Sequence, residues 1–521
     1  MFCFGVKRML HFDRTHNPKN NPELIAEMTN NMLPLKKLVK ETEQLFEQTC
    51  KNHQPDIPER ATKRSGSLLE KVMAWFFRIF AEPSTPLPPS KTIVDMEENI
   101  FPDWKEKLDQ EFNQLLNHIT LEVNVLDFGA IGDGKTDCTA AFRKAIGNGR
   151  VKVVVPEGVF ITKGIRLPSW TYLIGAGKGK TIIKLHNQAS KGIRLVTNAN
   201  HWKGNHHLFI KGLSLDWNIK RLGNTAKTST WGNHSSCLTY ANVTYGWVHE
   251  VEGINPGLHC FDISSTLYNY AGDGFRARGG SKYVWLNQVN GYGFGDDGVT
   301  THHSDYILIT HSHMCDPSGR SHQKGFSNSN GIEIDDGSRN VLLVQNSSAR
   351  CFGGIEIKAH ENSSAASNVQ IIGHISVNDN RSYNFRHIGH HKSTDEQSKT
   401  AFNISACSLI SIAPVYSDLY RDSAPRSLVV SGYQNVVINQ FWAIGDPHYD
   451  FKNNPVVAIQ YRARNVLLNR FSFSEFLNAG PAIKVYGGIN RPDFVNIQNV
   501  TTDDTFIKQV HGDRHLVPVM R

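Results

Sequence analysis

Between residues 270 and 360 the chain repeats one short hydrophobic pattern four times. Each copy begins with glycine, continues with an apolar residue, and places a small or apolar residue two positions later, as in 274–278, 298–302, 331–335 and 354–358. The glycines are separated by 24, 33 and 23 residues. Residues two apart in a β-strand share a face, so the pattern predicts short strands with one buried face. Its period is typical of one turn of a solenoid.

The same alternation predicts which side chains point away from the core. If the four copies stack, the outward positions form two columns, one with Arg276, Thr300, Glu333 and Glu356, the other with Arg278, His302, Asp335 and Lys358. Stacked strands lie about 4.8 Å apart. Each column is therefore expected to be a closely spaced ladder of charge.

Asparagine marks the start of several later apolar runs, at Asn340, Asn368, Asn435 and Asn465. Asparagine tolerates left-handed backbone geometry, and its side-chain amides can stack between neighbouring strands. The recurrence predicts parallel coils of two or three strands, with equivalent turns stacked on one another.

Residues 1–120 follow a different, helical pattern. We predict a helical region over 1–92 that includes a stiff proline-rich linker at 83–89. Within 93–120, apolar residues recur at steps of three and four, which predicts a helix that either forms a short coiled coil or caps the next domain. The alternating pattern that begins at Val123 assigns 121–515 to the β-solenoid.

The start of this solenoid carries a recognisable motif. The run V-L-D-F-G-A-I-G-D-G-K-T-D-C-T begins at Val125, and V-V-V-P-E-G-V-F follows at 153–160. Together they resemble the start of pectate-lyase-type right-handed parallel β-helices, which is shared by polygalacturonase-like enzymes and many bacteriophage tail spikes. The resemblance implies a mainly β fold, a right-handed parallel β-helix preceded by an α-helical N-terminal region. It implies a turn-shaping role for Asp133 and Asp137, and it does not specify a reaction.

A second, narrower resemblance covers residues 330–391. The runs G-I-E-I-D-D-G-S-R at 331–339, G-G-I-E-I-K-A-H at 353–360 and R-S-Y-N-F-R-H-I-G-H-H at 381–391 are similar to phage tail β-helices, including the pre-neck appendages of small Bacillus podophages. Those proteins bind, and in some cases cleave, cell-wall teichoic acid. The resemblance implies a homotrimeric virion component that contacts other tail or collar proteins through residues 1–120 and an anionic wall glycopolymer through the β-helix.

Charge is distributed unevenly along the chain. Residues 1–120 hold 16 Lys and Arg against 17 Asp and Glu, whereas 121–521 hold 40 against 31, so the net charge of +8 belongs to the predicted solenoid. This favours an anionic partner, although a basic, merely soluble surface explains it equally well. The chain contains neither a basic and aromatic nucleic-acid module nor an apolar run long enough to span a bilayer. We also expect no secretory signal at Met1–Leu10 and eight reduced cysteines, because no C-x-x-C occurs.

The columns supply the candidate chemistry. Two adjacent carboxyl groups can divide into acid and base, because like charges push one pKa upward, so we assign catalysis to Glu333 and Glu356. Asp335, Asp297 and His302 are expected to assist. Candidate substrate-binding residues are Arg276, Arg278, Asp296, Lys358, His360 and Arg386. A structural ladder of charge is the alternative for the glutamates, and a turn role is the alternative for Asp296 and Asp297.

Three functions remain open from the sequence. The preferred one is a phage tail spike or appendage that binds an anionic host glycopolymer and cleaves it by hydrolysis or elimination. The alternatives are a non-catalytic receptor-binding protein of the same fold and a cellular polysaccharide lyase or hydrolase. No cofactor is required for this chemistry, although a divalent cation could bridge Asp297, Glu333 and Asp335.

Overall fold

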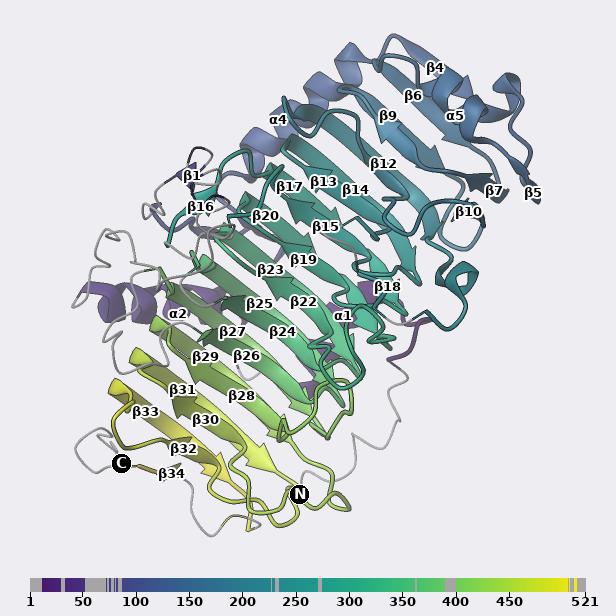
Figure 1. The fold of residues 1–521 in the computed structure, drawn as a ribbon. Helices are drawn as coiled ribbons and strands as arrows, with labels where there is room; N and C mark the ends of the chain where they lie inside the picture. The colour runs from purple at the N-terminus through teal and green to yellow at the C-terminus, as the bar shows by residue number, and fades with distance from the viewer. Residues whose placement is uncertain are drawn as a thin grey trace.

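A computed structural model describes residues 12–512, apart from 30–32, 52–71, 73–74, 76–78, 80, 83–86, 226, 230–233, 270–273, 361–362, 389–399, 505 and 507–509. The fold is the right-handed parallel β-helix expected from the sequence, with helices in its N-terminal region (Figure 1). Coils stack from β4 at one end to β34 at the other, and two long sheets run the length of the stack.

The first sheet has 12 parallel strands. They are β8 (Ile165–Leu167), β11 (Val196–Asn198), β13 (Leu238–Ala241), β15 (Phe261–Ser264), β19 (Val299–Thr301), β22 (Asn330–Ile334), β24 (Gly353–Ala359), β26 (Arg381–His387), β28 (Arg426–Ser431), β30 (Val457–Gln460), β32 (Ile483–Val485) and β34 (Val510–His511). We call this the short-strand sheet.

The second sheet has 18 strands. They are β4 (Leu121–Asn124), β5 (Asp133–Asp137), β6 (Val151–Val155), β7 (Gly158–Thr162), β9 (Thr171–Gly175), β10 (Thr181–Leu185), β12 (Asn205–Asp216), β14 (Val243–Ile254), β17 (Lys282–Asn287), β18 (Asn290–Tyr292), β20 (Asp305–Thr310), β21 (His313–Cys315), β23 (Arg339–Ala349), β25 (Ser367–Val377), β27 (Phe402–Ile412), β29 (Gln434–Ile444), β31 (Arg464–Ser474) and β33 (Asp493–Thr502). We call this the long-strand sheet.

The predicted asparagine turns are present. Asn340, Asn368, Asn403, Asn435 and Asn465 all adopt positive φ, between 53° and 66°. The Nδ2 of Asn403 donates to Oδ1 of Asn368, that of Asn435 donates to Oδ1 of Asn403, and that of Asn465 donates to Oδ1 of Asn435. Each amide therefore satisfies the next, which fixes the register of successive coils.

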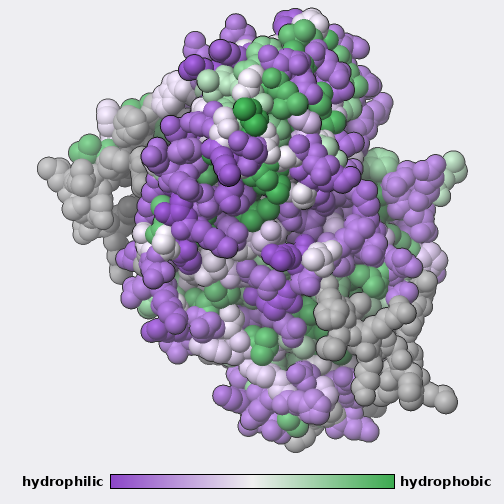
Figure 2. Space-filling view, turned by 90° about the vertical axis from the view of Figure 1, so that its right-hand side faces the viewer, coloured by the Kyte–Doolittle hydropathy of each residue, from purple (hydrophilic) through white to green (hydrophobic). Residues whose placement is uncertain are grey.

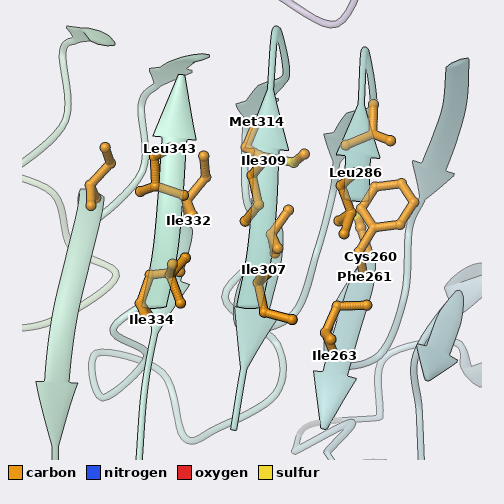
Figure 3. Packing of buried hydrophobic residues seen from close by; sticks show 14 of the residues in the cluster. Cys260, Phe261, Ile263, Leu286, Ile307, Ile309, Met314, Ile332, Ile334 and Leu343 are labelled. Atoms are coloured by element: carbon orange, nitrogen blue, oxygen red, sulfur yellow. The ribbon is translucent and has the colours of Figure 1, made fainter. Parts of the chain in front are cut away.

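The core between the two sheets is a set of stacked apolar residues. Figure 3 shows Phe261, Ile263, Ile332 and Ile334 from the short strands facing Ile307 and Ile309 of β20. Ile332 pairs with Val299 on one side and with Ile355 on the other. The repeated glycine is explained by close packing: a Cβ on Gly331 would lie 2.9 Å from the carbonyl oxygen of Gly354 in the next coil.

One of the four predicted copies is wrong. Residues 274–278 do not form a rung: β16 (Arg276–Ala277) pairs antiparallel with β1 (Ala81–Glu82), outside the short-strand sheet. The rung before β19 is β15, in which Asp262 occupies the position predicted for Arg276. The pattern misled because Gly274 lies in the connection between β15 and β17, where the same alternation occurs by chance.

The N-terminal region lies along the β-helix. The helices are η1 (Pro18–Asn20), α1 (Asn21–Met28), α2 (Leu35–Lys51) and α4 (Lys105–His118), and β2 (Thr92–Val94) pairs with β3 (Ile100–Pro102). Nδ2 of Asn21 donates to the carbonyl of Gln345, and Oγ1 of Thr42 accepts from Nδ2 of Asn439. These contacts place α1 and α2 against the long-strand sheet, as Figure 1 shows for both helices. Residues 1–11 and most of 52–86, including the start of the linker, lie outside the described residues.

Helix α4, predicted as a coiled coil or a cap, packs along the long-strand sheet. Its buried residues Leu108 and Leu115 join a cluster with Phe209 and Trp247 on the outer surface of the long-strand sheet. The core is closed at the first coil by η2 (Val125–Phe128) and α5 (Thr139–Ile146), whose Phe142 packs against Phe160. A further short helix, η3 (Ile219–Leu222), follows β12.

The surface and cysteines agree with the composition. The face to the right of Figure 1 is mostly hydrophilic, with hydrophobic residues in small separated groups (Figure 2). The described cysteines form no disulfide; Cys50 is half-buried and the other six are buried. Among the described residues, none of the helices is both long and apolar enough to span a membrane.

The asparagine ladder leads to a stability prediction. Asn403→Ala removes two amide hydrogen bonds and puts a Cβ-only side chain at φ 66°, whereas Asn403→Gly removes the same bonds and tolerates that φ. We expect alanine to reduce the free energy of unfolding by about 1 kcal/mol more than glycine. Chemical denaturation of the two variants beside the wild type measures this, and a glycine variant as unstable as the alanine variant would contradict it.

Candidate active site

Strand register brings the two predicted glutamates together. Glu333 of β22 and Glu356 of β24 are direct partners, and the same row continues to Thr300 and Asp262 on one side and Asn384 on the other. All these side chains point away from the apolar core, yet Glu333 is only 2% exposed and Glu356 is 0% exposed. The columns are thus covered at their outer side, which the strand pattern alone did not reveal.

Glu333 is held by two donors. Its Oε2 accepts a hydrogen bond of 2.7 Å from Nδ2 of Asn330 and lies 2.5 Å from Nζ of Lys358. The ammonium group of Lys358 also lies 3.6 Å from Oδ2 of Asp335. One buried cation is therefore shared by two carboxylates.

Glu356 has a different environment from its neighbour. Its Oε1 accepts from Nε of Arg386 at 2.5 Å, while Oε2 has no hydrogen-bond partner among the described residues. Arg386 is the strand partner of Lys358, so the two cations sit side by side. One oxygen of Glu356 is consequently fixed and the other is left for a further contact.

Asp335 and His302 extend the cluster along the second column. Nε2 of His302 lies 3.6 Å from Oδ2 of Asp335, and Nδ1 lies 3.8 Å from Oδ1 of Asp262. His360 is largely exposed and its Nδ1 binds Oδ2 of Asp336 at 2.9 Å. Because Asp336 and then Asp335 stabilise the imidazolium, the pKa of His360 rises to about 9.

Asp296 and Asp297 form a second carboxylate pair at the start of β19. Nε2 of His259 lies 3.4 Å from Asp297 and 3.7 Å from Asp296, and His322 lies 3.2 Å from Asp296. Burial opposes charge on His259, but the carboxylates of Asp296 and Asp297, which accept from its ring, outweigh burial and raise its pKa to about 10. Burial and then the charge of Asp296 raise the pKa of Asp297.

The two pairs are parts of one site because Asn330 joins them. Its backbone N–H donates to Oδ1 of Asp297, and its side-chain amide donates to Glu333. Asp297 contributes to the raised pKa of Glu333, after burial, which is the largest cause.

The balance of charges in this site favours the protonated form of Glu333. Asp297, Glu333, Asp335 and Glu356 interact with Lys358, whose pKa these carboxylates raise far above its ordinary value although burial opposes this. Four buried carboxyl groups facing Lys358 and Arg386 leave an excess of acids over cations. Because its pKa is raised, the Glu333 carboxyl group retains its proton at pH values where an exposed carboxyl group has already lost its proton.

Two predicted substrate-binding residues lie elsewhere. Arg276 is 1% exposed, and its guanidinium donates to both carboxylate oxygens of Asp305, at 2.8 and 3.0 Å. It is thus a structural anchor for the connection between β15 and β17 rather than a surface residue. Arg278 is exposed next to β16 and has no strand partner in the short-strand sheet.

Three groups of side chains could supply metal ligands. They are His259, Asp296 and Asp297; His302, Glu333 and Asp335; and Asp335, Asp336 and His360. Each group already contacts a protein cation: Lys358 lies between Glu333 and Asp335, and the raised pKa values of His259 and His360 favour imidazolium there. A divalent ion would have to displace that ammonium or deprotonate those rings.

Sequence reasoning missed His259, Asp262 and Asn330. His259 and Asp262 belong to the β15 rung, which begins with Cys260 where the recognised rungs have glycine. A search for the apolar alternation alone, without glycine, would have found Phe261 and Ile263 and hence these two residues. Asn330 directly precedes the recognised Gly331 but stands outside the repeated pattern.

Comparison with known proteins places the chain in a family. The sequence model described as rhamnogalacturonase A/epimerase, pectate lyase-like, matches residues 122–356. The N-terminal fragment of Bacteriophage Phi29 Gene Product 12, a crystal structure, is 40% identical and superposes with a TM-score of 0.69 over 80% of this chain and 68% of that chain. The chain belongs to the phage pre-neck appendage family.

Two curated relatives agree with this assignment. The Pre-neck appendage protein of Bacillus phage phi29 is 44% identical over 387 residues, which is 74% of this chain and 44% of that protein. Putative phage-related protein YobO of Bacillus subtilis is 49% identical over 395 residues, 76% of this chain and 49% of that protein. The chain spans about half the length of these curated relatives.

The shared cation at Lys358 yields a prediction. Lys358→Met leaves Glu333 and Asp335 buried without their counter-charge, and we expect a loss of about 3–5 kcal/mol in the free energy of unfolding near pH 8. Lys358 lowers the pKa of Glu333, so its removal raises that pKa further. A carboxyl group with a raised folded-state pKa stabilises the fold when protonated, and this stability is lost as pH rises. The deficit should therefore shrink toward about pH 5.

Denaturation curves at both pH values measure this effect. Lys135→Met, at an exposed position in β5, is the control and should change stability by less than about 0.5 kcal/mol. A Lys358→Met deficit that is equal at both pH values would show that packing, not charge, explains the role of Lys358.

Proposed function

We propose that this protein is a phage virion appendage whose β-helix binds an anionic glycopolymer of the host cell wall, such as teichoic acid, and cleaves it. Membership of the pre-neck appendage family supports the virion assignment over a cellular polysaccharide lyase or hydrolase. The single observation that carries the catalytic assignment is the unequal pair: Glu333, clamped by Asn330 and Lys358, beside Glu356, which keeps one oxygen unpartnered.

The pair suits general acid and base catalysis. Glu333, with its raised pKa, donates a proton to the departing oxygen of the polymer. Glu356, paired with Arg386 through Oε1, uses Oε2 to accept a proton from attacking water in hydrolysis, or from the substrate in elimination. Lys358 and Arg386 then stabilise negative charge that develops on the reacting groups. Supporting roles go to three neighbours. The charges of Asp335 and Asp297 hold the ammonium group of Lys358, and His302 lies beside Asp335.

Attachment to other virion proteins is assigned to the N-terminal region, and assembly is proposed as a homotrimer. Helices α1 and α2 lie along the long-strand sheet and the carboxylates lie on the short-strand sheet, so the two functions use different sides of each coil.

A non-catalytic receptor-binding protein is the second candidate. The burial of Glu333 and Glu356 favours it, because a catalytic group must reach its substrate. In that case the charged columns would be structural: their side chains would pair with one another and form a rigid support beneath a binding surface.

The two candidates differ in a direct assay. Purified wall polymer is incubated with the protein, and shortened chains or released subunits are measured. We expect Glu333→Gln and Glu356→Gln each to reduce cleavage by about 10²–10⁴-fold with little change in binding, because glutamine keeps the shape and loses the proton chemistry. Glu122→Gln, on the exposed strand β4, should cleave at the wild-type rate.

Cleavage by both active-site variants at the wild-type rate would refute the catalytic assignment. Binding by the wild type without any cleavage would establish the receptor-binding alternative.

A further inference from the structure

The row that contains Glu333 continues toward the first coils. Register pairs Thr300 with Asp262, Asp262 with Thr239, Thr239 with Thr197, and Thr197 with Arg166. Each step is about 4.8 Å, so Arg166 lies five strands, roughly 24 Å, from Glu333 on the same face of the short-strand sheet. Arg166 therefore belongs to the surface on which the carboxylates lie.

Positive charge collects at this end of the row. The side chain of Arg166 is exposed and forms no ion pair with any described carboxylate. His201 is close by, because its Nε2 lies 2.8 Å from Oγ1 of Thr197. Burial, and then the charges of Arg194 and Arg166, lower the pKa of His201 to about 4, and the same causes lower that of His234. The charge of Asp262 opposes these shifts at Arg194, His201 and His234, whose pKa values it raises.

Polar atoms without partners fill the stretch between these cations and Glu333. Oγ1 of Thr239, both carboxylate oxygens of Asp262 and Oγ1 of Thr300 are buried and have no hydrogen-bond partner among the described residues. Buried polar groups normally find partners. Ligand hydroxyl groups could donate to Asp262 and accept from the two threonines, which a chain of polyol or sugar units would provide.

An aromatic side chain lies at the edge of the same region. Trp202 follows His201, is 61% exposed, and has its carbonyl bound by Nδ2 of Asn242. Its backbone N–H is bound by Oδ1 of Asn200. A well-held, exposed indole can stack on the apolar face of a sugar or polyol unit.

We propose that Arg166, together with Trp202, forms a subsite for an anionic group on a hydroxyl-rich polymer, about five coils from the carboxylate pair. The inference rests on the proposed function and deepens it, because it names the ligand class: a chain with phosphodiester or carboxylate groups and free hydroxyls. Guanidinium groups suit either anion through paired N–H donors. The polymer would run along the sheet, over a row whose side chains from Thr197 to Glu333 are at most 2% exposed, so that one unit is gripped at Arg166 while another lies over Glu333 and Glu356.

The experiment measures binding of two polyanions to the full chain. Poly(glycerol phosphate) and polygalacturonate of matched length are titrated at low and high salt, with neutral dextran as reference. Arg166→Gln should weaken binding at low salt by about tenfold or more, with a smaller ratio at high salt, and Arg166→Lys should fall between it and the wild type. Arg143→Gln, exposed on α5, is the matched control and should bind as the wild type does. Thermal unfolding confirms that each variant is folded.

The outcomes separate the two proposals. Loss on the phosphate polymer alone identifies a phosphate subsite, loss on polygalacturonate alone identifies a carboxylate subsite, and loss on both identifies recognition by charge. Binding by Arg166→Gln equal to the wild type on both polymers would overturn the subsite while leaving the proposed function intact. A wild type that binds neither polyanion would overturn both, whereas an Arg166 effect in a protein that cleaves nothing would retain the subsite and remove only the catalytic step.

Discussion

Stacking of one coil on the next, at a spacing of about 4.8 Å, is the constraint on which the rest of this molecule depends. Every side chain meets its equivalents above and below, so an isoleucine in one rung requires an apolar partner in the next, as in Val299, Ile332 and Ile355. The same rule brings acidic residues into contact. Glu333 and Glu356 are neighbours because β22 and β24 pair in register, and the buried Lys358 and the half-buried Arg386 make that arrangement tolerable.

The coils keep this register through backbone geometry that few residues adopt. Asparagine occupies the left-handed turn position in the later coils and links its amides from Asn368 to Asn465. In the earlier coils the equivalent positions are Tyr283 and Tyr306, which also have positive φ and stack with ring centroids 4.7 Å apart. The change from amides to rings coincides with α4, because Trp104 packs edge-on against both tyrosines. Two kinds of side chain therefore occupy the same left-handed turn position: tyrosine where α4 packs over the turn, and asparagine in the later coils.

Local pattern was enough to predict the solenoid, its asparagine turns and the adjacency of Glu333 and Glu356, because each depends only on period and on residues two apart. It was not enough to exclude the 274–278 copy, since only the burial of Arg276 against Asp305 and the pairing of β16 with β1 distinguish that segment from a rung. Nor could it predict that the outward carboxylates are buried, because an alternating pattern gives the direction of a side chain and not what covers it. His259 and Asp262 were missed for a related reason: their rung replaces the marker glycine with Cys260.

Helix α4 carries a consequence for how such proteins can exchange parts. The sequence changes character near residue 121, where a recombination event would seem free to join this β-helix to another attachment module. The surface formed by Phe209 and Trp247 is nevertheless completed by Leu108 and Leu115 of the preceding helix. A junction at 121 would leave those rings bare to water, and exposed aromatic surface of this kind promotes aggregation. Viable chimaeras are therefore expected to inherit α4 together with the coils. The exchanged segment would then begin before residue 121, where the strand pattern starts.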